Sequence, residues 1–274
     1  MSPFEYNTYT EDDIKIRYSV RTSDEDYMRA AHRFLQKLMK EFARLSMKCY
    51  RPEYEAYNMP FYYSERRLDS VVLPALSNIC DGMVLTEMPV ERKERKTGEV
   101  IGSGHGRADY WCIFDGYTFV IEMKGSHARV GNYIIRKSSV VKRWKSMVDQ
   151  LESEKDECYE SQETTKGIIR LGLHFLTNVD YEQPTEEKIT AYRRTINDRL
   201  NDMYDRIHKE YNSSKYDPSY AAAWMVPDEI AQLFDDETDY GVILLAKIFR
   251  DIKHKAHIEG PRRRTRLEQS KSSP

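Results

Sequence analysis

Apolar residues recur at steps of three and four along residues 23–47, which is the period of a helix with one buried face. This stripe consists of Tyr27, Ala31, Phe34, Leu38, Phe42 and Leu45. Ser23 or Asp24 can accept hydrogen bonds from the first amide groups and so cap the helix. We therefore predict an amphipathic helix here. The polar residues 1–22 before it are expected to form an arm or a short edge element.

A second helical pattern follows a segment at 51–63 that is rich in proline and tyrosine and is expected to be a loop. Ser64 is placed to cap this helix, and Pro74 should kink it. The next part of the chain is typical of strands, at 83–90, 107–114 and 117–123. The charged residues 91–99 between the first two strands are expected to form a turn.

The rest of the chain again alternates between helical and strand patterns. We predict a helix at 137–154, a buried strand at 167–179, one long charged helix at 185–211, and strands at 221–226 and 240–248. This order predicts an α/β fold with a mixed central β-sheet flanked by helices. Three parts are expected: an N-terminal arm and helix (1–60) packed on the core, a main domain (61–252), and a basic, disordered tail (253–274).

Composition narrows the class of protein. Hydrophobic residues make up 40% of the 274 residues, so the chain can bury a core, and none of its apolar runs reaches the roughly 18 residues of a membrane helix. The polar N-terminus is unlike a signal peptide. Four separated cysteines without a CxxC pair argue against a zinc site and a disulfide framework, which indicates a cytoplasmic protein. A formal charge of −2 means that any surface for nucleic acid must be local.

The chemistry concentrates around a predicted hairpin. Asp115-Gly116 is a strong two-residue hairpin signal, and it would pair Phe114 with Tyr117. Counting outward from this turn places Asp109 opposite Glu122. Two opposed carboxylates repel each other unless a cation bridges them.

Two basic residues join these acids on the same face. Lys124 follows Glu122 by two residues, and its partner across the hairpin by the same count is Arg107. Mg²⁺ is commonly held by one or two carboxylates, and a neighbouring lysine can orient water or stabilise negative charge in hydrolysis of a phosphodiester. We therefore expect Asp109 and Glu122 to bind metal and Lys124 to position the nucleophile. The backbone carbonyl of Met123 could be one more ligand.

The spacing Glu-x-Lys is weak evidence by itself, because the chain contains four such triplets, which start at Glu91, Glu94, Glu122 and Glu186. Three of them lie in charged, solvated stretches. Only Glu122 lies inside an apolar strand pattern, FVIEMKG, where an acid and a base are costly to bury. The alternative is that these residues form a salt-bridged strand end.

The segment GRADYWCIFDGYTFVIEMKGS at 106–126 resembles the core of the PD-(D/E)XK nuclease superfamily. The resemblance extends over roughly residues 60–180 and implies a restriction-endonuclease-like core within the main domain. Asp109 and Glu122 match the acids of the motif and Lys124 its lysine, which implies that they form the catalytic centre. Ala108 stands where the family motif has proline.

The resemblance also implies two auxiliary residues. Glu65, at the start of the second helix, matches a glutamate that many members carry as a metal ligand, and Gln150 matches a glutamine that often faces the site. The alternatives are an acid that suits a helix N-terminus and a surface amide. For Arg107, Lys142 and Arg143 we expect contacts with the nucleic-acid backbone. A charge-balanced, solvated helix face is the alternative for Lys142 and Arg143.

These features favour an endonuclease that depends on Mg²⁺ or Mn²⁺ and cuts DNA, with a role in restriction, repair or antiviral defence. Two alternatives stay open: an RNA-cutting or ligand-activated effector of the same fold, and a non-catalytic module that binds nucleic acid or protein. Nucleic acid is the expected partner, and a homodimer or a partner protein could supply specificity. No membrane association is expected.

Overall fold

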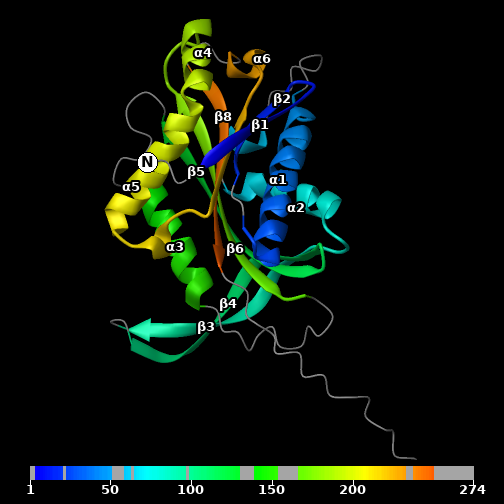
Figure 1. Cartoon of the computed structure of the whole chain (residues 1–274), viewed down its shortest axis with the longest axis vertical. Coiled ribbons are helices and arrows are strands. Elements are labelled where there is room, and N and C mark those ends of the chain that lie inside the picture. Colours follow the sequence, from blue (N-terminus) through cyan, green and yellow to red (C-terminus); the bar gives the residue numbers. More distant parts are fainter. Residues whose placement is uncertain are drawn as a thin grey trace, which may run out of the picture.

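The protein contains one continuous β-sheet with helices on both faces (Figure 1). The computed structural model describes residues 4–20, 23–50, 59–62, 65–96, 99–129, 139–153, 166–232 and 237–249. Residues 51–58 of the loop expected at 51–63, and the tail expected from residue 253, lie outside these residues.

Within the described residues, eight strands form the sheet, in the order β1-β2-β7-β8-β6-β5-β4-β3. They are β1 (Glu5–Glu11), β2 (Ile14–Val20), β3 (Leu85–Lys96), β4 (Glu99–Phe114), β5 (Tyr117–Arg129), β6 (Ile168–Asp180), β7 (Tyr220–Met225) and β8 (Thr238–Phe249). β5 and β6 are parallel, and the other neighbouring strands are antiparallel. The predicted α/β class and the mixed central sheet flanked by helices are therefore confirmed.

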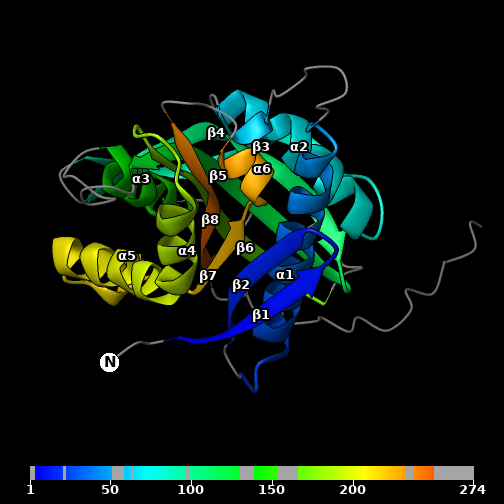
Figure 2. The same ribbon diagram turned by 90° about the horizontal axis from the view of Figure 1, so that it is seen from above.

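The helices form two layers (Figure 2). They are α1 (Asp26–Met47), α2 (Glu65–Ile79), α3 (Ser139–Ser153), α4 (Glu186–Arg194), α5 (Ile196–Tyr211) and α6 (Asp228–Ala231), with 3₁₀ turns η2 (Pro60–Tyr62) and η4 (Ser214–Tyr216). α1 and α2 cover one face of the sheet, where Phe34 stacks on Phe119 with 4.3 Å between ring centroids. α3 covers the other face. None of the described helices combines the length and the apolar character that crossing a membrane requires.

The apolar stripe of the first helix is confirmed as a buried face. Ala31, Phe34, Leu38 and Phe42 of α1 are inaccessible to solvent. The polar residues before it form a hairpin of β1 and β2, with β1 at the edge of the sheet. The expectation of an edge element is therefore confirmed.

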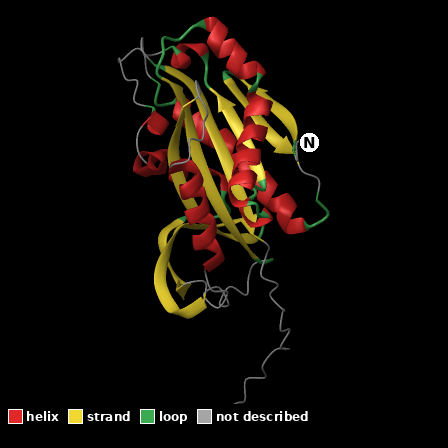
Figure 3. Cartoon of the chain, turned by 90° about the vertical axis from the view of Figure 1, so that its left-hand side faces the viewer, coloured by secondary structure: helices red, strands yellow, loops and turns green. Residues whose placement is uncertain are grey.

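The charged residues 91–99 were expected to be a turn, and this prediction is wrong. β3 continues through Lys96, and β4 starts at Glu99, so the two strands pair through most of the segment that was expected to be a turn. They form a ribbon that projects beyond the rest of the sheet (Figure 3). A projecting ribbon is stabilised by its backbone ladder and needs no apolar face, so its sequence lacks the alternation by which strands are recognised.

The prediction of one helix at 185–211 is also wrong. The helix is interrupted at Thr195, which has φ −98° and ψ 11° and separates α4 from α5. Both helices bury apolar side chains, Tyr192 in α4 and Leu200 in α5. Because only one residue leaves helical geometry, the spacing of apolar residues continues across the break and does not reveal it.

Candidate active site

The hairpin between β4 and β5 sets the positions of the candidate site. Asp115 and Gly116 both have positive φ, 54° and 76°, as a type I′ turn requires. Pairing runs from Phe114 and Tyr117 at the turn to Tyr110 and Ile121. The register inferred from the Asp-Gly turn is therefore confirmed over these five pairs.

Side chains replace backbone partners at the open end of this hairpin. The backbone N–H of Met123 donates to Oδ2 of Asp109 at 2.6 Å. The carbonyl oxygen of the same residue accepts from Nζ of Lys124 at 2.9 Å. In a strand these two backbone groups point to the same neighbour, here β4. The side chains of Asp109 and Lys124 thus provide hydrogen-bond partners for the backbone of Met123 where the ladder between β5 and β4 ends.

Glu122 and Lys124 form an ion pair on one face of β5. Nζ of Lys124 lies 3.0 Å from Oε1 of Glu122, and the two side chains are 18% and 3% exposed, respectively. The intervening Met123 points to the opposite face, into the core with Ile121. The predicted common face of Glu122 and Lys124 is therefore confirmed. A buried carboxylate needs a nearby positive charge, and Lys124 provides it.

β6 supplies a neighbour that the sequence analysis did not single out. His174 pairs with Lys124 across the parallel ladder and is inaccessible to solvent. Its Nε2 lies 2.9 Å from the hydroxyl oxygen of Ser126, and its ring stacks on Trp144 of α3. Burial, with the positive charges of Arg143 and Lys124, lowers the pKa of His174 to about 3. Its sequence signal is a single histidine within the apolar run LGLHFL.

α3 lies over the same face of the sheet. Met147 and Leu151 pack against Gly172, where an added Cβ would meet their side chains at 2.8 and 3.0 Å. Gly172 pairs with Glu122, so α3 passes directly beside the ion pair. Arg143 donates from its guanidinium to the carbonyl oxygen of Gly125 on β5.

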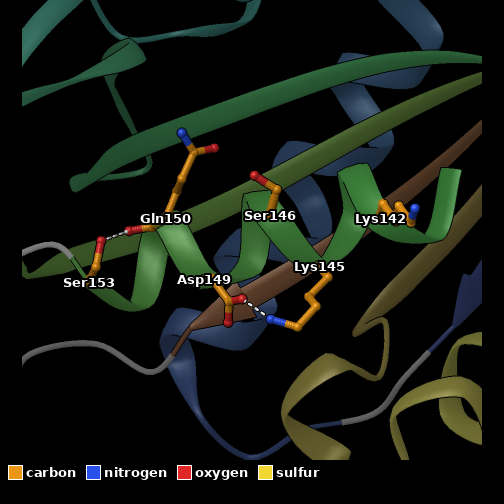
Figure 4. A pocket seen from close by; sticks show the side chains of 6 residues that line it. All are labelled: Lys142, Lys145, Ser146, Asp149, Gln150 and Ser153. Atoms are coloured by element: carbon orange, nitrogen blue, oxygen red, sulfur yellow. Dashed lines mark hydrogen bonds and ion pairs between the residues drawn. The ribbon is translucent and has the colours of Figure 1, made fainter. Parts of the chain in front are cut away.

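Gln150 and Lys142 line a surface pocket of about 410 Å³ (Figure 4). The other lining residues are Lys145, Ser146, Asp149 and Ser153. Helical spacing places Gln150 on the same side of α3 as Arg143, which faces β5. Gln150 therefore lies on the side of α3 nearest the candidate site. The exposed Lys142 and Arg143 are accessible to a large ligand on this side.

Two further candidates stand apart from the buried pair. Arg107 on β4 is 69% exposed and forms an ion pair of 3.3 Å with Glu87 of β3. Glu65 is the first residue of α2, as predicted, but its side chain lies outside the described part of the structure.

Among the residues that the structure describes, no three His, Cys, Asp or Glu side chains gather closely enough to hold a metal. The oxygen atoms around Lys124 nevertheless suit a cation, because a carboxylate and a carbonyl both lie within 3.0 Å of its ammonium group. Oxygen atoms of these two kinds are the ligands that Mg²⁺ prefers.

Comparisons of the chain with models of protein families, with curated proteins and with solved structures give no match.

Proposed function

We propose that the protein is a metal-dependent nuclease that hydrolyses phosphodiester bonds, with DNA as the expected substrate. The observation that carries the proposal is the buried pair of Glu122 and Lys124 at the open end of the β4–β5 hairpin. Asp109 and the carbonyl group of Met123 lie at the same opening. The carboxylates and the carbonyl oxygen are suitable ligands for a metal ion, and the ammonium group can stabilise the charge that develops in phosphodiester hydrolysis.

The order of elements around the site supports the proposal. α2, β3, β4, β5, α3 and β6 follow one another between Glu65 and Asp180. This segment coincides with the part of the sequence that resembles the PD-(D/E)XK nucleases. We propose that it forms a restriction-endonuclease-like core, to which β1, β2, β7 and β8 are added.

Mg²⁺ or Mn²⁺ would be held by Asp109, Glu122 and the carbonyl oxygen of Met123, with Glu65 as a further candidate. When bound, such an ion neutralises charge on the phosphate and acidifies water. In the structure the ammonium group of Lys124 supplies the positive charge beside Glu122 and Met123. These residues thus accommodate a cation at this point of the sheet.

Lys124 has two tasks in this proposal. Its ammonium donates hydrogen bonds, so it can orient an attacking water or stabilise negative charge on the phosphate. The neighbouring His174 stays neutral at physiological pH, because its pKa is about 3. It therefore adds no positive charge that would repel Lys124. Gln150, Lys142 and Arg143 border the side of α3 from which we expect the nucleic acid to approach.

A second candidate function is a non-catalytic module that binds nucleic acid. It is favoured by the 3% exposure of Glu122 and its existing ion pair, which also suit a purely structural role. In that case the module would bind nucleic acid without cutting it.

Cleavage of plasmid DNA, linear DNA and RNA with Mg²⁺ or Mn²⁺ tests the proposal. Asp109→Ala and Glu122→Gln should abolish cutting, which chelation of the metal should also stop. Lys124→Ala should slow cutting by about 10²–10³, as the loss of a comparable charge contact does elsewhere. All variants should be compared at a temperature at which circular dichroism shows that they are folded.

Lys188→Ala is a matched control, because Lys188 ends another Glu-x-Lys triplet, on α4, and pairs with Glu182 at 2.8 Å. It should cut like the parent. Equal rates for Lys124→Ala and the parent would show that Lys124 is no catalyst. A parent chain that binds nucleic acid tightly but never cuts it with either metal would favour the binding module.

A further inference from the structure

Two cysteines that are remote in the sequence meet where the end of α2 reaches β4. Cys80 is the residue after α2, and Cys112 lies in β4. The backbone N–H of Asp81 donates to the carbonyl oxygen of Ile113 at 2.8 Å, which joins the residues that follow the two cysteines. The carboxylate of Asp81 also accepts from the backbone N–H of Asp115 at 2.6 Å. The backbones at the two cysteines are therefore held side by side.

The two thiols differ in accessibility. Cys112 is inaccessible to solvent in the core, whereas Cys80 is half-buried. The neighbouring thiol of Cys80, together with burial, raises the pKa of Cys112 well above its ordinary value. A small oxidant therefore meets Cys80 first and finds Cys112 as a protonated thiol directly behind it.

We propose that Cys80 and Cys112 form a redox-sensitive dithiol, which a peroxide converts into a disulfide. Cys80 attacks a peroxide oxygen, so that an S–O bond forms and the O–O bond breaks. With hydrogen peroxide the second oxygen leaves as water, after taking the proton of the Cys80 thiol. The product at Cys80 is a sulfenic acid.

Cys112 then resolves this sulfenic acid. Its sulfur attacks the sulfur of Cys80, the S–S bond forms, and the S–O bond breaks. The oxygen leaves as a second water, which carries the proton of Cys112. In sum, two thiols and one hydrogen peroxide give one disulfide and two waters, and an added dithiol reverses the change by thiol–disulfide exchange.

The disulfide would link α2 covalently to β4, the strand that carries Asp109. Tyr110 of this strand already donates from its hydroxyl to the carboxylate of Asp69 on α2. The linkage would therefore secure a contact that is already formed in the reduced protein. The dithiol does not depend on the proposed nuclease activity.

Peptide mapping of the full-length chain tests the proposal. The protein is treated with hydrogen peroxide, unfolded, alkylated with N-ethylmaleimide and digested without reductant. We expect a peptide that links Cys80 to Cys112 and separates on addition of dithiothreitol. Alkylation of Cys112 in the unfolded chain should be lost in parallel.

Three variants complete the experiment. In Cys80→Ser, Cys112 should stay fully alkylatable after peroxide, because the neighbouring thiol with which it forms the disulfide is removed. In Cys112→Ser, Cys80 should remain a sulfenic acid that a dimedone probe traps. Cys49→Ser should behave like the parent, since Cys49 is also half-buried and its thiol instead contacts the carbonyl oxygen of Leu45 at 3.8 Å.

The proposal is overturned if peroxide leaves both thiols alkylatable. It is equally overturned if Cys80 proceeds to a sulfinic acid while Cys112 remains a thiol. Linkage of Cys80 to Cys49 or Cys158 in place of Cys112 would show that the arrangement at the end of α2 does not direct the chemistry.

Discussion

At the scale of single residues, Glu122 is the group whose burial costs most free energy in the candidate site. A carboxylate with 3% exposure loses nearly all of its hydration, and the ammonium of Lys124 at 3.0 Å offsets this loss. Replacing one residue of such an ion pair leaves the other as a buried charge without a partner. Replacing both residues by uncharged ones leaves no uncompensated charge.

This asymmetry predicts a measurable coupling between the two residues. Lys124→Met should lower the free energy of unfolding by about 3–5 kcal/mol, because the carboxylate stays buried without its partner. The double variant with Glu122→Gln should lose clearly less. Urea denaturation of the parent, the two single variants and the double variant gives the coupling free energy. Lys188→Met is the surface control, and it should lower the free energy of unfolding by less than about 1 kcal/mol. Strictly additive effects would contradict the buried pair.

His174 predicts a dependence of stability on pH. Its pKa is lowered from 6.5 to about 3 in the folded protein, mainly by burial. Below pH 6.5 the unfolded chain binds a proton that the folded protein does not, so this residue destabilises the fold as the pH falls toward about 3. The slope approaches about 1.4 kcal/mol per pH unit within this window.

Urea denaturation between pH 7 and pH 4 checks this expectation. His174→Gln should flatten the pH dependence relative to the parent, whatever its effect on stability at neutral pH. Equal slopes for the parent and His174→Gln would rule out His174 as the cause.

At the scale of elements, the two helices before β7 have different starts. The hydroxyl oxygen of Thr185 accepts from the backbone N–H of Lys188 at 3.2 Å and caps α4. Thr195, at the start of α5, makes no such cap, and its hydroxyl donates back to the carbonyl of Ala191 at 2.9 Å. Threonine thus caps the helix at position 185 but not at position 195.

The difference predicts unequal costs for one substitution. Thr185→Ala should lower the free energy of unfolding by about 1 kcal/mol, because an orphan amide loses its acceptor. Thr195→Ala should cost less, since it removes no cap. Thermal or urea unfolding of the two variants in parallel checks this order, and the reverse order would mean that the break at Thr195 stabilises the pair of helices.

Elements could be predicted from the sequence wherever a local rule fixes them. Asp115-Gly116 demands a turn with two positive φ angles, and this turn sets the register between β4 and β5. The period of two along β5 places Glu122 and Lys124 on one face. The stripe of α1 is equally local, because it follows from helical spacing. The extension of β3 and β4 into a ribbon could not be predicted, because residues 91–96 are all charged and show no alternation of apolar and polar positions.

Contacts between segments that are distant along the chain could not be predicted either, for a different reason. His174 reaches Lys124 only through the parallel pairing of β5 and β6, and Cys80 reaches Cys112 only because α2 ends beside β4. Neither contact has a characteristic spacing along the chain. The spacing of cysteines along the chain therefore does not indicate that Cys80 and Cys112 are neighbours in the fold.

At the scale of the whole molecule, Gly241 lies where β8 joins the two halves of the sheet. It pairs with Asn178 of β6 on one side and with Met225 of β7 on the other. Its φ is 133°, and an added Cβ would lie 2.0 Å from the carbonyl oxygen of Trp224. A side chain at this position would force the strands apart.

Gly241→Ala should therefore destabilise the protein by more than about 4 kcal/mol, which is exceptional for one methyl group. Gly82→Ala is a matched control, because Gly82 also has a positive φ, 151°, but nothing lies within 4 Å of the added atom. We expect the control to cost about 1–3 kcal/mol from backbone strain alone. Equal losses of stability in urea would show that the contact with Trp224 is relieved by small shifts.

The position of the N-terminal hairpin has a consequence for synthesis in the cell. β2 pairs with β7, and the backbone N–H of Ala221 donates to the hydroxyl of Ser19, 202 residues earlier in the chain. On the ribosome, β2 emerges well before β7, so it must wait for the translation of the residues between them before it finds this neighbour. Throughout this interval the hairpin presents an open edge to other nascent chains. We expect the yield of native protein to depend on how well chaperones shield that edge during translation.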